Sequence, residues 1–157
     1  MLDRRDHPDD TAEQPSLTIQ PSLAGQLREN DPAKVVDMML HCYVEALRAR
    51  DLDGAMALFA PDATLIGSEP GGSAHSTDEL RALHERIFTE PVTYGWQWRN
   101  PVATRHGDVV WFAAKATWVI QGKGGAELPY QLSGVLYRTP AERWVFELFN
   151  GSRPTKR

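Results

Sequence analysis

The fold is decided by DVVWFAAKATWVIQGKGGAELPYQLSGVLYRTPAERWVFELFNG, residues 108–151. This stretch alternates between two sets of side chains and is rich in Val, Trp, Phe and Tyr, as β-strands are. With the residues before it, it predicts four long strands joined by short turns, over Thr93–Thr104, Asp108–Gln121, Glu127–Thr139 and Arg143–Gly151. Successive strands joined by short turns pair antiparallel, so the C-terminal half is predicted to be an antiparallel meander.

Helical patterns precede the strands. Asp31 is a good N-cap, Pro32 suits the first helical position, and apolar residues then recur at spacings of three and four. The sequence STDE at 76–79 has the capping-box pattern of a further helix start. Two shorter helices are predicted over 52–60 and 78–89. Between them, a short strand is predicted over Ala63–Gly67 and a glycine-rich loop over 68–75.

Three helices followed by a curled antiparallel sheet indicate an α+β fold. Within Asp108–Gln121 both alternating sets are largely apolar. The first set is Val110, Phe112, Ala114, Ala116 and Trp118, and the second is Trp111, Ala113, Lys115 and Thr117. A sheet with only one buried face would carry polar residues on the other. We therefore expect the helices to cover one face and a second copy of the chain to cover the outer face as a homodimer.

Composition limits the function classes. The chain has 157 residues, a net charge of −4 and one cysteine, which fits a single domain without an internal disulfide. Residues 1–31 hold three basic and seven acidic side chains and no aromatic one, so 1–30 is expected to be a disordered acidic tail. The domain is expected over 31–153, with a short tail at 154–157. With no basic stripe and no long apolar run, we expect no nucleic-acid or membrane partner and a cytoplasmic location.

Three segments carry a family resemblance. They are YVEALRARDLDGAMALFAPDATLIGSEPGG at 43–72, STDELRALHERIF at 76–88 and RWVFELFNGS at 143–152. They resemble the SnoaL-like branch of the nuclear transport factor 2-like superfamily, whose relatives include ketosteroid isomerases, polyketide cyclases and scytalone dehydratase. The resemblance covers roughly 32–153. It implies a cone-shaped, strongly curved sheet wrapped around the three helices, with a deep apolar pocket at the open end.

The comparison with ketosteroid isomerase can be made position by position. The pocket tyrosines of that enzyme fall on Tyr43, Phe59 and His84 of this chain. Its base aspartate falls on Gly67, and its protonated aspartate falls near Gly134. Both carboxylates are missing, so steroid isomerisation by the two-aspartate mechanism is not expected.

Three side chains remain as candidates for proton transfer. Tyr43 and His84 each lie on the apolar face of a helix, where they are either a pocket donor with a proton-transfer partner or plain core residues. The resemblance turns Glu147 toward the cavity, near Lys115. That carboxylate is then a functional group, half of a structural ion pair, or a solvated group at the rim.

Aromatic residues indicate a ligand. Trp96 and Trp98 are two apart and share a strand face. The resemblance turns them toward the cavity together with Trp111, and Phe59 and Phe149 would complete its wall. The alternative is that the tryptophans fill the cone or a dimer interface.

These residues predict a small-molecule-binding domain for a hydrophobic, ring-shaped ligand. It would act as a cofactor-independent isomerase, cyclase or dehydratase, with Tyr43 as donor and His84 or Glu147 transferring the proton. The alternative is a non-catalytic ligand carrier or a dimeric association module, which the missing carboxylates favour. The spacing of histidines and cysteine matches no metal motif, and no glycine-rich phosphate loop is present, so neither a metal nor a cofactor is expected.

Overall fold

A computed structural model of the chain describes residues 31–155. The predicted acidic tail at 1–30 and the last two residues therefore lie outside the described part. The described part contains three helices, α2 at Pro32–Ala49, α3 at Leu52–Met56 and α4 at Thr77–Phe88. None of the helices within residues 31–155 is long and apolar enough to span a membrane.

The helix starts follow local capping chemistry. The Asp31 carboxylate accepts from the backbone N–H of Ala33 at 3.1 Å, directly before Pro32. At α4, the Ser76 hydroxyl accepts from the N–H of Glu79 at 3.2 Å, and the Glu79 carboxylate accepts from the N–H of His75 at 2.7 Å. Each such cap satisfies N–H groups that have no partner inside the helix.

The second helix is shorter than predicted. It ends at Met56, and the segment from Phe59 is a strand. The cause is tertiary, because the backbone carbonyl of Leu58 accepts from the N–H of Phe146 at 2.7 Å, which draws the chain into the sheet. The prediction of helix over 52–60 is therefore wrong for its last four residues.

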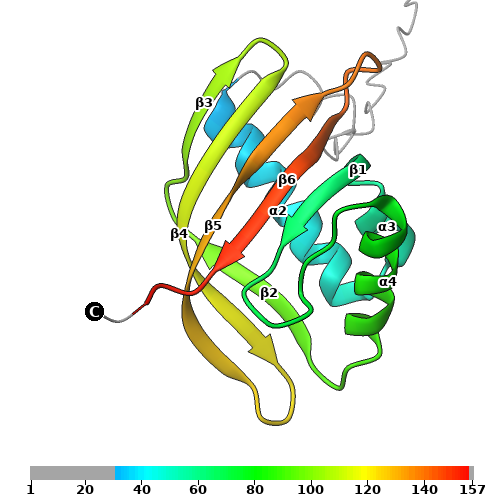
Figure 1. Cartoon of the computed structure of the whole chain (residues 1–157). Helices are drawn as coiled ribbons and strands as arrows, with labels where there is room; N and C mark the ends of the chain where they lie inside the picture. Colours follow the sequence, from blue (N-terminus) through cyan, green and yellow to red (C-terminus); the bar gives the residue numbers. More distant parts are fainter. Residues whose placement is uncertain (1–30, 156–157) are drawn as a thin grey trace, which may run out of the picture.

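Six strands form one curved, unclosed sheet. They are β1 Phe59–Ile66, β2 Thr93–Trp98, β3 Val102–His106, β4 Val109–Gln121, β5 Ala126–Arg138 and β6 Trp144–Ser152. The order is β1-β6-β5-β4-β2, and β3 also pairs with β4. The predicted antiparallel meander is confirmed for β2 to β6, whereas β1 pairs parallel to β6. The α+β architecture is as expected, with α2 lying across the sheet (Figure 1).

The first predicted strand, Thr93–Thr104, is broken in two. Asn100 has a φ of 47°, which is left-handed backbone, and Pro101 has no N–H to donate to a ladder. Both halves still pair with β4, with Trp98 opposite Ala116 and Val102 opposite Ala113. β2 and β3 therefore share β4 as their partner strand.

A bulge interrupts β6. Leu136 on β5 faces Phe146 while the preceding Val135 faces Leu148, so Glu147 has no opposite residue. The extra residue shifts the alternation by one position. Phe146 and Phe149 are consequently both buried, although they are three positions apart, and Glu147 is exposed.

The two faces of β4 have the predicted composition. Val110, Phe112 and Ala114 are buried beneath the helices, whereas Trp111 and Lys115 are exposed on the outer face. The core therefore lies between the inner face of the sheet and the helices.

Candidate active site

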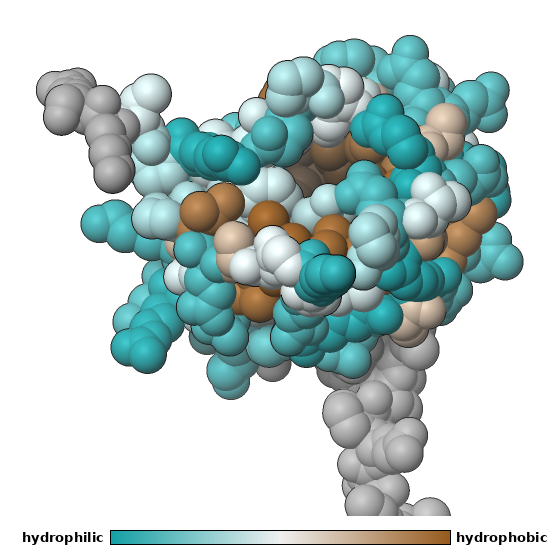
Figure 2. Space-filling view, turned by 90° about the horizontal axis from the view of Figure 1, so that it is seen from below, coloured by the Kyte–Doolittle hydropathy of each residue, from teal (hydrophilic) through white to brown (hydrophobic). Residues whose placement is uncertain are grey.

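A cavity of about 260 Å³ opens between α2, α4, the loop after β1 and the inner face of the sheet. Six aromatic side chains contribute to its wall, namely Tyr43, Tyr94, Trp96, Trp118, Tyr130 and Phe149. On the face seen from below, hydrophobic residues show at the bottom of a hollow that a mostly hydrophilic surface surrounds (Figure 2). An apolar cavity with a few polar groups is typical of a small-molecule site.

The sheet register brings the aromatic wall together. Trp96 on β2 lies directly opposite Trp118 on β4, and Ala116, on the same face as Trp118, lies opposite Tyr130 on β5. Directly opposed residues of paired strands share a face, so all three side chains point toward the helices. Phe149 joins them from β6, with its ring centroid 5.2 Å from that of Trp96.

Tyr43, in the cavity wall, is hydrogen-bonded to His84, which is fully buried and does not line the cavity. The Tyr43 hydroxyl lies 2.9 Å from Nε2 of His84, and Nδ1 of His84 lies 2.8 Å from the carbonyl oxygen of Leu80. Because a carbonyl only accepts, Nδ1 carries the hydrogen, and Nε2 accepts the proton of the phenol. The helix backbone thus fixes the tautomer of the imidazole.

Burial keeps both members of this pair neutral. His84 is fully buried and Tyr43 is 2% exposed. Desolvation lowers the pKa of His84 and raises the pKa of Tyr43 far above the ordinary value of a phenol. The resting state is a neutral phenol that donates to a neutral imidazole.

The pair can relay a proton. Tyr43 belongs to the cavity wall, and its oxygen keeps acceptor capacity while its own hydrogen points to His84. When the Tyr43 oxygen receives a proton from a ligand, the phenol can pass its own proton to Nε2 of His84. The reverse sequence returns the proton, which is the requirement for general base and then general acid catalysis.

Neighbouring phenyl rings hold the tyrosine in place. Phe59 and Phe149 both meet the Tyr43 ring edge to face, at centroid separations of 5.3 and 5.2 Å. Phe59 also contacts the His84 ring, at 5.8 Å, but it does not belong to the cavity wall. The structure therefore places Phe59 behind the Tyr43–His84 pair.

Polar side chains gather at the cavity mouth. The Tyr130 hydroxyl donates to the Ser68 hydroxyl at 3.0 Å, and the Glu69 carboxylate meets the Arg153 guanidinium at 2.7 Å. Tyr94 donates to the Glu90 carboxylate, and desolvation, followed by this acceptor, raises the pKa of Tyr94 to about 12. These contacts tie the loop after β1 to β5 and to the residue that follows β6.

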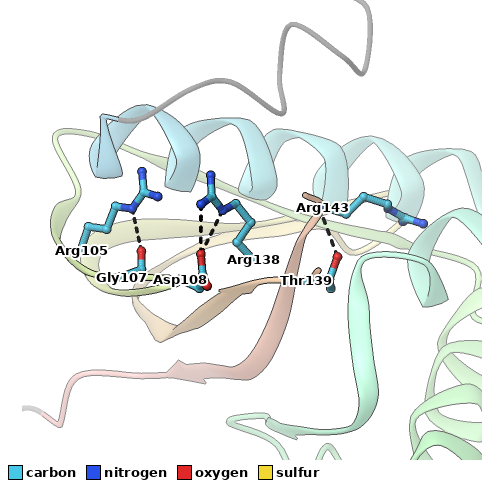
Figure 3. Close-up of polar contacts among 6 residues, drawn as sticks. All are labelled: Arg105, Gly107, Asp108, Arg138, Thr139 and Arg143. Carbon is cyan, nitrogen blue, oxygen red and sulfur yellow. Dashed lines mark hydrogen bonds and ion pairs between the residues drawn. The ribbon is translucent and has the colours of Figure 1, made fainter. Parts of the chain in front are cut away.

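The end of the sheet away from the cavity carries arginines that fix turns. Nε of Arg105 donates to the carbonyl oxygen of Gly107 at 2.8 Å, and Arg138 pairs with Asp108 at 3.1 Å (Figure 3). The backbone N–H of Arg143 donates to the hydroxyl of Thr139 at 3.2 Å (Figure 3). These three contacts hold the turns before β4 and between β5 and β6, which indicates a structural role.

Several predicted site residues lie elsewhere. Trp111 and Lys115 are on the outer face of β4, because they alternate with the buried residues of that strand. Glu147 is the exposed bulge residue. Among the described residues, no ion pair joins Lys115 to Glu147, and Lys115 lies opposite Gln131 of β5. The cavity orientation predicted for these three residues is wrong.

Trp98 faces the helices but not the cavity. Its indole N–H donates to the Asp37 carboxylate at 2.7 Å, and its ring contacts that of His41 at 4.7 Å. It lies in a shallow groove between α2 and β2. Of the tryptophans proposed for the pocket, Trp96 alone belongs to the cavity wall.

Tyr94, Trp118 and Tyr130 were not among the predicted site residues. The alternation of Asp108–Gln121 places Trp118 with Phe112 on the inner face, which was a usable signal. Tyr94 and Tyr130 become wall residues only through the pairing of β2 and β5 with β4.

The two glycines at the isomerase carboxylate positions leave no room for a side chain. A Cβ on Gly67 would lie 2.4 Å from the carbonyl oxygen of Gly72, and one on Gly134 would lie 2.3 Å from that of Leu148. A carboxylate at either position would require backbone movement. Within residues 31–155, no group of three His, Cys, Asp or Glu side chains is placed to hold a metal ion.

Solved structures share this fold. A protein from Streptomyces avermitilis, assigned as a dehydratase of the nuclear transport factor 2-like family, matches with a TM-score of 0.69 at 12% identity, over 79% of this chain and 96% of that chain. A ketosteroid isomerase-like protein from Erwinia carotovora atroseptica matches with a TM-score of 0.63 at 19% identity, over 82% and 100%. A protein from Xanthomonas campestris, assigned as a calcium/calmodulin-dependent protein kinase II association domain, matches with a TM-score of 0.67 at 14% identity, over 78% and 88%.

Identities this low establish a common fold and no common activity. The sequence itself matches the family model of the SnoaL-like domain over residues 36–156, which includes the residues that α2 and α4 contribute to the cavity and all six described strands. The chain therefore belongs to the SnoaL-like domain family.

Proposed function

We propose that this protein binds a small, flat, hydrophobic ring compound in the cavity and moves a proton on it, as a cofactor-independent isomerase, cyclase or dehydratase. The observation that carries the proposal is the hydrogen bond between Tyr43 and His84 at the wall of an apolar cavity. The cavity volume of about 260 Å³ suits one or two fused rings, since it is just below the roughly 300–1,000 Å³ of most ligand pockets.

The relay differs from the simple donor role expected for Tyr43. Because its hydrogen is directed to His84, Tyr43 meets a ligand first as an acceptor. The chemistry that follows is removal of a proton from a carbon next to a carbonyl, with His84 as the final proton acceptor. Isomerisation, cyclisation and dehydration can each begin with this step, and names of related folds include a dehydratase and an isomerase-like protein.

A non-catalytic carrier or association module is the second candidate. One related fold bears the name of an association domain. The outer face of the sheet exposes apolar side chains, with Val102 at 61% and Trp111 at 42% exposure, which supports a homodimer through that face. Such a dimer is compatible with either function, so turnover decides between them.

The test uses 2-tetralone, a two-ring ketone with exchangeable α-protons. Proton NMR in D₂O measures their exchange, and calorimetric titration measures binding. We expect exchange above the buffer rate, reduced about 100-fold or more in Tyr43→Phe and in His84→Gln, because loss of a positioned acid–base group typically costs that much. Tyr130→Phe is the matched control, since this cavity tyrosine contacts Ser68 and not the histidine.

The outcomes separate the candidates. Binding of 2-tetralone without exchange in any variant would support the carrier. Exchange that persists in both Tyr43→Phe and His84→Gln would exclude the relay.

A further inference from the structure

We propose that the cavity mouth contains a cation subsite that Arg153 occupies in the free protein, and that the ring compound bound below it carries an ammonium or guanidinium group. The inference rests on the proposed function in one respect only, namely that the ring of the ligand lies in the cavity. It adds the chemical class of the ligand and assigns a specificity role to Glu69 and Trp118.

The subsite is defined by how the protein's own cation is held. The central carbon of the Arg153 guanidinium lies 5.4 Å from the centre of the Trp118 ring. One of its nitrogens lies 2.7 Å from the Glu69 carboxylate. An aromatic face combined with a carboxylate is the arrangement that recognises organic cations in proteins.

More aromatic surface surrounds the same position. Tyr94 stacks on Trp118 at a centroid distance of 5.6 Å and 25°, and Tyr130 meets it at 5.2 Å and 36°. Trp118, Tyr130 and Glu69 all belong to the cavity wall, so the subsite is continuous with the ring pocket. The Glu69 charge also acts across the mouth. After burial, which is the main cause, it helps to raise the pKa of both Tyr94 and Tyr130.

Arg153 can leave this position at little cost. The Arg153 and Glu69 side chains are 48% and 47% exposed, and ion pairs in such an environment are weak because water screens them. Arg153 follows the last residue of β6, and no helix or strand includes residues 153–155. A ligand cation that enters the cavity with its ring can therefore replace the guanidinium between Glu69 and Trp118.

The other charged groups at the cavity mouth determine that a positively charged ligand is favoured. Glu69, Glu90 and Arg86 are the charged residues of the cavity wall. The Arg86 guanidinium is already bound to the carbonyl oxygen of Gly71 at 2.7 Å. Once Arg153 moves away, two carboxylates face one guanidinium, so an incoming cation is favoured over an anion.

The experiment compares three probes that differ in one group, 2-naphthylmethylamine, 2-naphthylmethanol and 2-naphthoate. Their dissociation constants are measured by calorimetric titration for the wild-type chain, Glu69→Gln and Arg153→Gln. Asp53→Asn is the matched control, since Asp53 belongs to another exposed pair, with Arg81 at 3.9 Å, and neither residue belongs to the cavity wall.

In Arg153→Gln, the amine should bind roughly three- to tenfold tighter than the alcohol, as expected for one exposed cation–π contact and one exposed ion pair. In the wild-type chain this ratio should be about threefold smaller, because the guanidinium of Arg153 competes for the same two contacts. Glu69→Gln should bring the ratio close to one, and Asp53→Asn should leave it unchanged.

Two results would overturn the cation subsite. One is an amine that binds no tighter than the alcohol in both the wild-type chain and Arg153→Gln. The other is a preference for naphthoate that disappears in Arg153→Gln, which would show an anion subsite. In either case binding of the alcohol would leave the ring pocket intact, whereas failure of all three probes to bind would overturn the proposed function as well.

Discussion

His84 lies between the Tyr43 hydroxyl and the backbone carbonyl of Leu80, without solvent-exposed surface. The carbonyl favours a hydrogen on Nδ1, and burial opposes a second proton on Nε2 by lowering the pKa. Unlike an exposed histidine, this residue can store a proton only when a neighbouring group compensates the charge. In the proposed relay that compensation comes from the negative charge developing on the ligand.

The lowered pKa of His84 predicts how stability depends on pH. In the unfolded chain the imidazole takes up a proton below about pH 6.5, whereas in the folded chain it does so only at lower pH. The free energy of unfolding should therefore fall as the pH drops below about 6.5, by up to about 1.4 kcal/mol per pH unit. Urea unfolding at pH 7.5, 6.5 and 5.5 measures this.

The His84→Gln variant serves as the comparison for that series. All other titratable residues are the same in both proteins, so only the difference between the two pH slopes reports on His84. Equal slopes would show that His84 takes up a proton as readily in the folded chain as in the unfolded one.

At the scale of the element, the bulge in β6 determines which side chains reach the core. A regular strand would place Glu147 on one face with Phe149, and Phe146 on the other. With the extra residue, Phe146 packs against Phe59 at 5.3 Å and Phe149 packs against Tyr43 at 5.2 Å, both on the inner side. The bulge thereby supplies two phenyl rings to the support of the Tyr43–His84 pair.

Truncation along β6 tests this register. Phe146→Ala should lower the free energy of unfolding by about 3–5 kcal/mol, because it removes a fully buried ring and leaves a cavity. Glu147→Ala should change it by no more than about 0.5 kcal/mol, as for other exposed positions. Urea unfolding of the two variants decides the matter. A large loss for Glu147→Ala with a small one for Phe146→Ala would mean that β6 alternates regularly.

At the scale of the whole molecule, the sheet has one face covered by its own helices and one face without cover within residues 31–155. Val102 and Trp111 are exposed on that outer face. A shallow groove of about 500 Å³ runs over the same face, lined among others by Val102, Ala113 and Lys115. Exposed apolar surface of this kind is typical of association sites.

The homodimer proposed through this face can be tested by introducing a charged side chain on the outer face of the sheet. Trp111→Lys should shift the chain from dimer to monomer in sedimentation velocity, because two buried ammonium groups would face each other across a two-fold interface. Ser73→Lys, an equal charge change at an exposed loop position, should leave the dimer intact. A wild-type chain that sediments as a monomer at all concentrations would rule out the dimer.

Some features of the structure could be predicted because their causes are local. The caps at Asp31 and Ser76 act on N–H groups two or three residues away, and both helix starts follow from them. The alternation along β4 sorts Phe112 inward and Trp111 outward without reference to any partner. The prediction that Trp111 faces the cavity came from the family resemblance and is wrong, whereas the alternation along β4 places Trp111 on the face opposite Phe112.

Other features depend on contacts between distant segments. The parallel pairing of β1, the bulge at Glu147 and the early end of α3 arise from the register of β6 against its neighbours. Because register is a property of two strands, one strand's sequence does not contain it.

By itself, the sequence determined the α+β class, the helix starts, the inward set of β4 and the family. It also singled out Tyr43 and His84, each from its place on the apolar face of a helix. Only the tertiary structure decided that these two residues, 41 positions apart, share a hydrogen bond, and that Trp96, Trp118 and Tyr130 form one wall. The reason is range, since capping and alternation act over a few residues, whereas the site is built by strand pairing and helix packing across the whole domain.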